Sequence, residues 1–319
     1  MDNLKSSLYV IGNLLVFFSL YTFIPGLYDY VTLGTDWAVF FLISIVCLFT
    51  GLNISFTFKN KNKEVEVLSA FILTFISWII LTLIASIPFS LGTPNLSFVN
   101  SFFESMSGLT TTGATIFSGL DNMPKAILIW RAVLQWLGGM GILVLTIAIL
   151  PMLGVGGMQI FRAEVSGPMK DKKFTPRIAE TAKALWTIYI TLTIFCAFFY
   201  WVAGMSGFDA IAHSFTTVSI GGLSTHDLSF SYFQNPTVEF IAVIFMLIAG
   251  MNFTLHFAAI RNLSFKAYFK SLENKCFISV ISISVLVVFY SLLSTSSSDD
   301  YLNLIRISLF NVVSIATTT

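Results

Sequence analysis

The sequence predicts an all-α protein that crosses a membrane several times and carries repeated segments that enter the membrane and turn back. Of its 319 residues, 56% are hydrophobic and 10% are charged, whereas about a quarter of the residues of a soluble domain are charged. Seven apolar runs can span the bilayer, whose hydrocarbon core of roughly 30 Å takes about 20 helical residues. Three shorter apolar runs alternate with them, and the stretches that follow are rich in threonine or glycine.

Each long run is expected to form a membrane-spanning helix. These runs are Leu8–Leu27, Trp37–Phe58, Val67–Leu91, Ala126–Leu153, Ala184–Met205, Val238–Ile260 and Cys276–Leu293. The short runs are Phe98–Leu109, Phe208–Val218 and Tyr301–Val313. They are too short to cross alone, and an irregular backbone at membrane depth is tolerated only where it lines water or binds something.

The order of long and short runs predicts four segments. Two long runs come first, long–short–long follows twice, and a long run with a short one closes the chain. We therefore expect an N-terminal transmembrane helix pair at 1–64 and a first helix, loop and helix unit with a basic cytoplasmic loop at 65–180. A second unit is expected at 181–275, and an incomplete third at 276–319.

Basic residues predict the orientation, because lysine and arginine near span ends favour the cytoplasmic side. If every long run crosses, 14 of the 17 basic residues fall on the same side as the N-terminus, and only Lys125, Arg131 and Arg306 do not. We therefore expect a cytoplasmic N-terminus and short runs that enter from outside. The net charge of +1 offers no basic surface for nucleic acid, and the expected partner of the apolar surface is membrane lipid.

The three short runs and the turns behind them are copies of one another. Setting Gly113 against Gly222 aligns FFESMSGLTTTGAT with IAHSFTTVSIGGLST, and LFNVVSIATTT ends the chain in a third copy. Three polar positions then coincide. Glu104, His213 and Asn311 share the first, Ser107, Thr216 and Ser314 the second, and Thr110, Ser219 and Thr317 the third. Internal repetition of this kind makes an ordinary polar turn a poor explanation.

The repeated turn has the chemistry of a cation site. Backbone carbonyls can replace the hydration shell of K+ without a fixed charge, and glycine allows the unusual backbone that aims them inward. The C-terminal end of each short helix favours a cation through the helix dipole. Asp209, Asp299 and Asp300 stand near helix starts, where acidic residues can cap.

Other polar residues are predicted to be structural. Arg131 is expected near the outer interface, where its side chain can reach water, and Arg306 raises the same question. His213, His226 and His256 are expected in different layers, as hydrogen-bonded residues rather than metal ligands.

The motifs FFESMSGLTTTGAT, WLGGMGILVLTIAILPMLGVGGMQIFRAE, HSFTTVSIGGLSTHD, AGMNFTLHF and FNVVSIATTT resemble the Trk/Ktr superfamily of bacterial potassium uptake proteins, specifically its TrkH branch. The resemblance implies repeated helix, re-entrant pore loop and helix units around a pseudo-fourfold pore, after an extra N-terminal helix pair. It also implies a homodimer in the bacterial inner membrane and a cytosolic, nucleotide-binding regulatory partner of the TrkA type. K+ is the implied transported ion, and no organic cofactor is expected.

The resemblance also assigns the ion site residue by residue. The implied selectivity-filter carbonyls belong to Thr111, Thr112, Ile220, Gly221, Thr318 and Thr319. The residues expected to support the filter are Thr110, Gly113, Ser219, Gly222 and Thr317. One departure from the family is large, because the third copy stops before its glycine. We therefore expect an N-terminal portion of a potassium transporter that does not conduct alone.

Two other classes stay open from the sequence. A sodium-coupled solute transporter would need breaks inside long spans and an inverted repeat, whereas the copies here have one orientation. A non-conducting membrane scaffold would use the helices for assembly only. An enzyme is not expected, because no span carries a paired acid, base or metal cluster.

Overall fold

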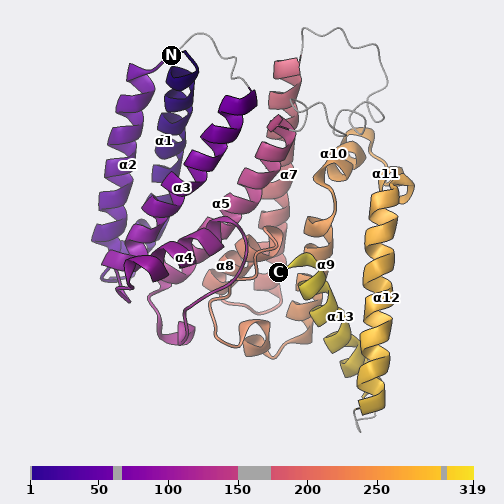
Figure 1. The fold of residues 1–319 in the computed structure, drawn as a ribbon. Coiled ribbons are helices and arrows are strands. Elements are labelled where there is room, and N and C mark those ends of the chain that lie inside the picture. Colours follow the sequence, from indigo (N-terminus) through magenta and orange to yellow (C-terminus); the bar gives the residue numbers. More distant parts are fainter. Residues whose placement is uncertain (1, 60–66, 150–173, 296–299) are drawn as a thin grey trace. The chain divides into compact units, whose positions relative to one another are not determined.

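The computed structural model describes residues 2–59, 67–149, 174–295 and 300–319 (Figure 1). Every regular element within these ranges is a helix, as expected for this fold class. The α-helices are α1 (Asp2–Val31), α2 (Trp37–Thr57), α3 (Val67–Leu91), α4 (Phe98–Leu109), α5 (Lys125–Ile149), α7 (Phe174–Val202), α8 (Gly207–Val218), α9 (Pro236–Gly250), α10 (Phe253–Asn262), α11 (Lys266–Lys270), α12 (Leu272–Thr295) and α13 (Tyr301–Thr317). Two 3-10 turns are η1 (Leu120–Asn122) and η2 (Ser229–Phe233).

The chain divides into two compact units. The first consists of Met1–Leu109, Ala114–Leu134 and Gly141–Lys173, and the second of Thr110–Gly113, Gln135–Met140 and Phe174–Thr319. The four residues Thr110–Gly113 therefore group with the later copies of the repeat rather than with the short helix α4 that precedes them.

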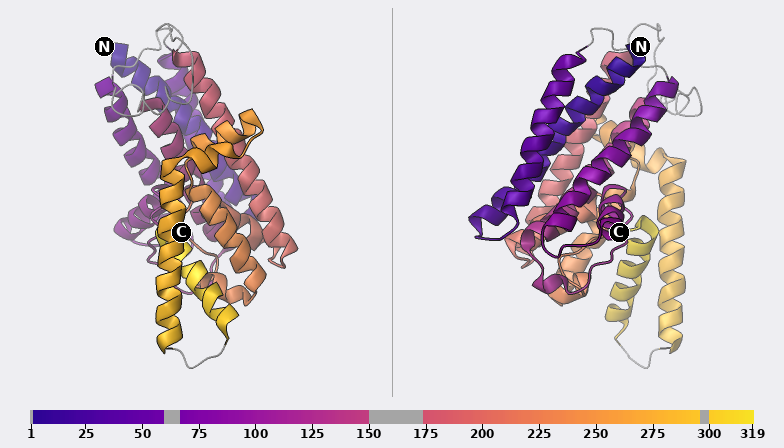
Figure 2. Two further views of the ribbon diagram at one scale, coloured as in Figure 1. Left: turned by 90° about the vertical axis from the view of Figure 1, so that its right-hand side faces the viewer. Right: turned by 60° about the vertical axis from the view of Figure 1, so that its left-hand side comes forward.

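The first unit is built on close packing of α1 against α2, which lie side by side in both views (Figures 1 and 2). Small residues allow this approach, since a Cβ on Gly12 would lie 2.9 Å from the carbonyl oxygen of Gly51. The start of α5 adds the fully buried Trp130, whose ring meets Phe18 and Phe40 edge-on at 5.6 and 5.9 Å. Its indole N–H donates to the carbonyl of Ala85 at 3.1 Å.

The second unit packs the short helices α8 and α13 against longer ones. Helix α8 lies against α7 and α9, while α13 contacts α9 and α12. A buried hydrogen bond of 2.9 Å joins the hydroxyl of Tyr200 in α7 to Thr217 at the end of α8. The end of this short helix, and hence the turn that follows it, is thus held from the side.

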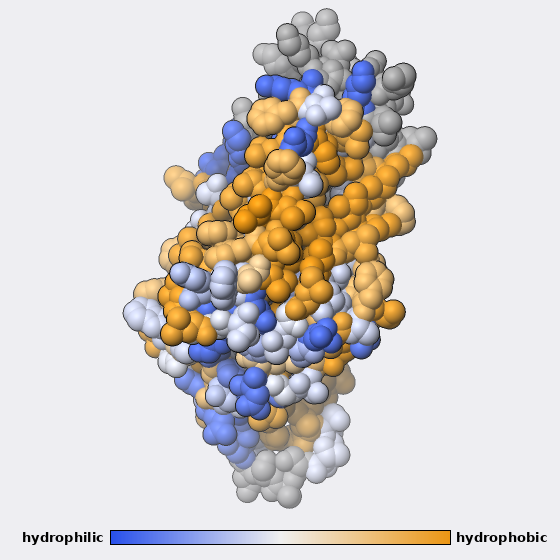
Figure 3. All heavy atoms as spheres, turned by 90° about the vertical axis from the view of Figure 1, so that its left-hand side faces the viewer, coloured by the Kyte–Doolittle hydropathy of each residue, from blue (hydrophilic) through white to orange (hydrophobic). Residues whose placement is uncertain are grey.

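The outer surface is that of a membrane protein. Among the described residues, five helices are long and apolar enough to cross a membrane, or six if the bent pair α9–α10 is one span. The remaining expected span, Ala126–Leu153, runs into residues outside the described ranges. Figure 3 shows hydrophobic side chains gathered over the α1–α2 side, where Leu20, Ile45 and Phe49 are more than half exposed.

The expectation of one unbroken helix over Val238–Ile260 is wrong. The chain bends by 90° between α9 and α10. Asn252 starts the second helix, because its side chain accepts from the N–H of Thr254 at 3.0 Å. The carbonyl of Ile248 accepts from the N–H of Met251 at 3.2 Å, and the ring of His256 bonds to the same oxygen at 2.9 Å, so a side chain of the second helix is tied to the end of the first.

The short helices agree well with the predicted runs. Helix α4 has the predicted bounds, α8 starts one residue earlier at Gly207, and α13 extends beyond Val313 to Thr317. Most of the predicted basic loop lies outside the described residues, because these omit 150–173.

Candidate ion-binding site

The turns after the three short helices share one unusual backbone conformation. Thr111, Ile220 and Thr318 occupy equivalent positions of the repeat, and their φ angles are +56°, +50° and +63°. Left-handed backbone is uncommon for residues other than glycine and costs the most for β-branched ones such as these. The same costly conformation in all three copies indicates that the turn is built for a purpose beyond connecting helices.

The hydrogen bonds that form this turn also repeat. In the second copy the N–H groups of Ile220 and Gly221 donate to Thr217 and Thr216, at 3.1 and 2.9 Å. In the third copy Thr318 donates to Ile315 at 3.2 Å and Thr319 to Ser314 at 2.9 Å. In both copies the left-handed residue thus follows the end of the short helix and leads directly into the segment behind it.

Within the second unit the three segments lie next to one another. Gly113 and Gly222 have φ angles of +76° and +75°. A Cβ on Gly113 would collide with the carbonyl oxygen of Gly221, and a Cβ on Gly222 with the main chain of Thr319. Two features therefore require glycine at both positions: the backbone conformation and the close approach of the next copy.

Hydroxyl groups brace two of the three segments. Thr110 and Thr112 share a hydrogen bond of 2.7 Å between their hydroxyls. Thr317 and Thr319, at the equivalent positions, share one of 2.9 Å. The backbone that carries the expected carbonyls is thus tied to the residue at which the turn begins.

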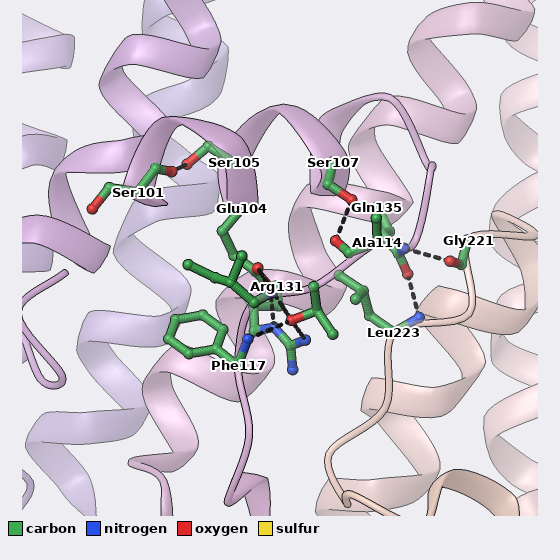
Figure 4. A network of polar contacts seen from close by, with 12 residues as sticks. Ser101, Glu104, Ser105, Ser107, Ala114, Phe117, Arg131, Gln135, Gly221 and Leu223 are labelled. Carbon is green, nitrogen blue, oxygen red and sulfur yellow. Dashed lines mark hydrogen bonds and ion pairs between the residues drawn. The ribbon is translucent and has the colours of Figure 1, made fainter. Parts of the chain in front are cut away.

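A buried ion pair joins two helices of the first unit (Figure 4). Glu104 in α4 and Arg131 in α5 approach to 2.8 Å, with side-chain exposures of 0% and 1%. The hydroxyl of Thr115 donates to Glu104 at 2.9 Å and accepts from Arg131 at 2.9 Å. Glu104 also accepts from the N–H of Ile116 at 3.1 Å, and the guanidinium lies 5.2 Å from the ring centre of Phe117.

This network holds the non-helical segment that follows the first turn, and it overturns one expectation. Arg131 does not extend to an outer interface. A charge at such a buried position is stable only with a partner, and Glu104 and Thr115 supply that partner. The sequence had already placed Glu104 at a repeated polar position.

The second copy has the same arrangement with a histidine in place of the ion pair. The ring of His213 bonds to the hydroxyl of Ser224 at 2.9 Å, as Glu104 does to Thr115. The same hydroxyl accepts from the N–H of His226 at 3.1 Å, just as Thr115 accepts from Phe117 at 3.1 Å. In both copies a side chain from the short helix thus anchors the non-helical segment that follows the turn.

The expectation that His213 and His226 lie in different layers is wrong. His213 bonds to the carbonyl of Asp209 at 2.9 Å, and His226 lies 3.3 Å from the Asp209 carboxylate. Burial acts to raise the pKa of Asp209, but hydrogen bonds from Ser206 and Thr225 and the nearby histidines hold it below its usual value. Among the described residues, no group of three or more His, Cys, Asp or Glu residues is arranged to hold a metal ion.

The predicted caps are partly right. Asp300 caps α13, because its side chain accepts from the N–H of Asn303 at 3.1 Å. Ser206 caps α8 in place of Asp209, which lies in the first turn and accepts from the Ser206 hydroxyl at 2.7 Å. Asp299 lies outside the described residues. Arg306 bonds to Asn303 at 2.7 Å.

Gln135 is a site residue that the sequence analysis did not predict. Its fully buried side chain contacts the second segment, with hydrogen bonds to Gly221 and Leu223 at 2.6 and 3.0 Å (Figure 4). A signal existed, because an amide in an apolar span four residues after Arg131 lies on the same helix face, and polar residues within spans are usually functional.

Comparison with known proteins identifies the family. The model of the family described as "TrkH: Cation transport protein" matches residues 37–314. The chain belongs to the TrkH family. A TrkH protein of Vibrio parahaemolyticus, named a Trk system potassium uptake protein, is 46% identical over 317 residues, which cover 98% of this chain and 65% of the relative. The TrkH protein of Escherichia coli K12 is 45% identical over 314 residues, covering 97% and 64%.

A solved structure agrees with this assignment. The crystal structure of the potassium transporter TrkH from Vibrio parahaemolyticus superposes with a TM-score of 0.86 at 42% identity, covering 98% of this chain and 64% of that one. The chain is therefore a multi-pass membrane protein of the TrkH family. It spans about 65% of the length of the curated relatives it matches.

Proposed function

We propose that this chain supplies the selectivity filter of a potassium uptake protein. The observation that supports this most is the repeated left-handed turn at Thr111, Ile220 and Thr318, within segments that belong to one compact unit. Equivalent backbone turns offer equivalent carbonyl groups, and a set of carbonyls is what replaces the water around a K+ ion.

The proposed ligands are main-chain oxygens, and K+ is the cargo rather than a resident cofactor. They belong to Thr111, Thr112, Ile220, Gly221, Thr318 and Thr319. Thr110, Gly113, Ser219, Gly222 and Thr317 act as their supports. The carbonyl of Gly221 already accepts from Gln135, and because a carbonyl has two lone pairs, one remains for an ion.

Location and partners follow from family membership and charge placement. We place the chain in the bacterial inner membrane, with a cytoplasmic N-terminus and short helices that enter from outside. A homodimer and a cytosolic, nucleotide-binding regulator of the TrkA type are proposed as protein partners, and lipid covers the exposed apolar helices. The four segments 1–64, 65–180, 181–275 and 276–319 are proposed as the organising units.

A solute carrier is the second candidate. Its need for breaks inside long spans no longer counts against it. The 90° bend between α9 and α10 is a break inside a predicted span, which such carriers use to bind solutes. The filter is favoured because three copies repeat one turn in the same orientation, and because relatives such as the E. coli protein are named as potassium uptake proteins.

The test uses a chimera in which residues 1–319 replace the matching part of the Vibrio parahaemolyticus protein. It is expressed in a bacterial strain that lacks potassium uptake and grows only at high K+. We expect growth at low K+ and uptake of K+ in preference to Na+. Replacing Gly113 by serine is expected to change this preference.

Each outcome separates the candidates. A chimera that reaches the membrane at the level of the intact relative, yet takes up no K+, contradicts the proposal. Uptake of K+ with a preference that Gly113→Ser leaves unchanged favours the solute carrier or the scaffold for this region.

A further inference from the structure

The second filter segment lacks the brace that the other two contain. Thr110 with Thr112, and Thr317 with Thr319, pair their hydroxyls across two residues. The equivalent positions of the second copy are Ser219 and Gly221. Glycine has no side chain, so no hydroxyl pair can form there, and Gly221 is the least restricted of the three equivalent residues, Thr112, Gly221 and Thr319.

Gln135 occupies the place of the missing brace. Its Nε2 donates to the carbonyl of Gly221 at 2.6 Å, and its Oε1 accepts from the N–H of Leu223 at 3.0 Å. The side-chain amide therefore bridges Gly222 and pairs with the main chain on both sides of it. The orientation of the amide follows from its partners, because a carbonyl can only accept and an N–H can only donate.

Gly221 and Gln135 are matched in space. A Cβ on Gly221 would lie 2.6 Å from Nε2 and 2.7 Å from Oε1 of Gln135, so any larger residue would displace the amide. The φ angle of Gly221 lies outside the left-handed region. Contact with Gln135 is therefore what requires glycine at this position.

We propose that Gln135 is a specificity-determining positioning residue, which fixes the carbonyl of Gly221 in place of the threonine pair of the other copies. This inference rests on the proposed function, because it concerns one of the proposed K+ ligands. The amide is fully buried, so no water competes for the two bonds. A carbonyl whose direction is fixed before the ion arrives needs no reorganisation when it binds, and this favours one ion size over another.

The first test asks whether the brace exists, independently of transport. Purified chain 1–319 and its Gln135→Met variant, which keeps the length of the side chain but lacks both polar atoms, are compared by amide hydrogen exchange. We expect exchange across 219–225 to rise about tenfold, the factor that matches one ordinary hydrogen bond. Thr22→Val is the control, because it removes a fully buried hydroxyl bond in α1.

The second test asks whether the brace sets selectivity, and it uses the chimera described above. We expect Gln135→Met to lower the preference for K+ over Na+ about tenfold, with Thr22→Val unchanged. Gly221→Thr alone is also expected to lower the preference for K+ over Na+, because the threonine Cβ collides with the Gln135 amide. The double variant Gln135→Ala/Gly221→Thr makes room and restores a hydroxyl opposite Ser219, and it is expected to recover most of the preference.

The outcomes are distinct. Unchanged exchange at 219–225 in Gln135→Met refutes the brace, whether or not the chimera transports. Raised exchange with unchanged selectivity refutes the role in specificity, as does a double variant no better than Gln135→Ala and Gly221→Thr measured singly. A parent chimera without K+ uptake counts against the proposed function, and the exchange experiment then still decides whether Gln135 holds the segment.

Discussion

Arg131 and Glu104 form an ion pair that is closed to water, with Nε and Oε1 2.8 Å apart and side-chain exposures of 1% and 0%. The two residues come from α5 and α4, and Thr115 bonds to both. Each charge depends on the other. A buried charge without a partner destabilises the fold by far more than an intact buried pair stabilises it.

Removing one member of this pair is therefore expected to be more harmful than removing both. Glu104→Gln or Arg131→Met should each destabilise the folded chain by roughly 3–5 kcal/mol, while the double variant should lose less than either. Unfolding of purified chain 1–319 in detergent measures this as a double-mutant cycle. Additive losses would show that the two charges do not interact.

Gly113 is expected to be intolerant of alanine because of contact rather than backbone strain alone. Gly119 provides a matched control: its φ of +75° is close to the +76° of Gly113, and nothing lies within 4 Å of its Cβ position. Both substitutions carry a similar strain, of about 1 kcal/mol. Only Gly113→Ala should also change the K+ over Na+ preference of the chimera. Equal effects would locate the cause in the backbone conformation.

The hydroxyls of Thr115 and Ser224 occupy equivalent positions but should contribute differently to the stability of the folded chain. Thr115→Val removes bonds to two charged groups, whereas Ser224→Ala removes a bond to His213. Because bonds to charged groups are roughly twice as strong, we expect losses of about 2–3 and about 1 kcal/mol. Thermal unfolding compares them. A larger loss for Ser224→Ala would contradict this account.

The bend between α9 and α10 is expected to depend on Tyr268. The carbonyl of Ile248 can only accept, so Nε2 of His256 carries the proton and Nδ1 accepts from the Tyr268 hydroxyl at 2.7 Å. Tyr268→Phe should cost about 1 kcal/mol and raise hydrogen exchange over 253–262. Tyr290→Phe, at a side chain 73% exposed, is the control. Equal exchange in both variants would remove Tyr268 from the bend.

Much of the fold could be predicted because apolar length and repetition are local properties. The bounds of α4 agree with the prediction, and those of α8 differ by one residue. The break at Asn252 was not predicted, because the apolar run continues across it. The features that mark it are the Asn252 cap of α10 and the contacts of His256. The burial of Arg131 was not predicted either, since its partner Glu104 is 27 residues away in the chain.

The amino-acid sequence alone determined the membrane class, the short helices and the position of each turn, because these depend on the length and order of apolar and polar residues. Tertiary structure decided which residues hold the turns. Gln135 and Gly221 are 86 positions apart, and the local sequence around either residue does not indicate that the two are in contact. The left-handed backbone at Ile220 could not be predicted either, because a β-branched residue does not favour it. It depends on hydrogen bonds and packing that exist only after the helices assemble.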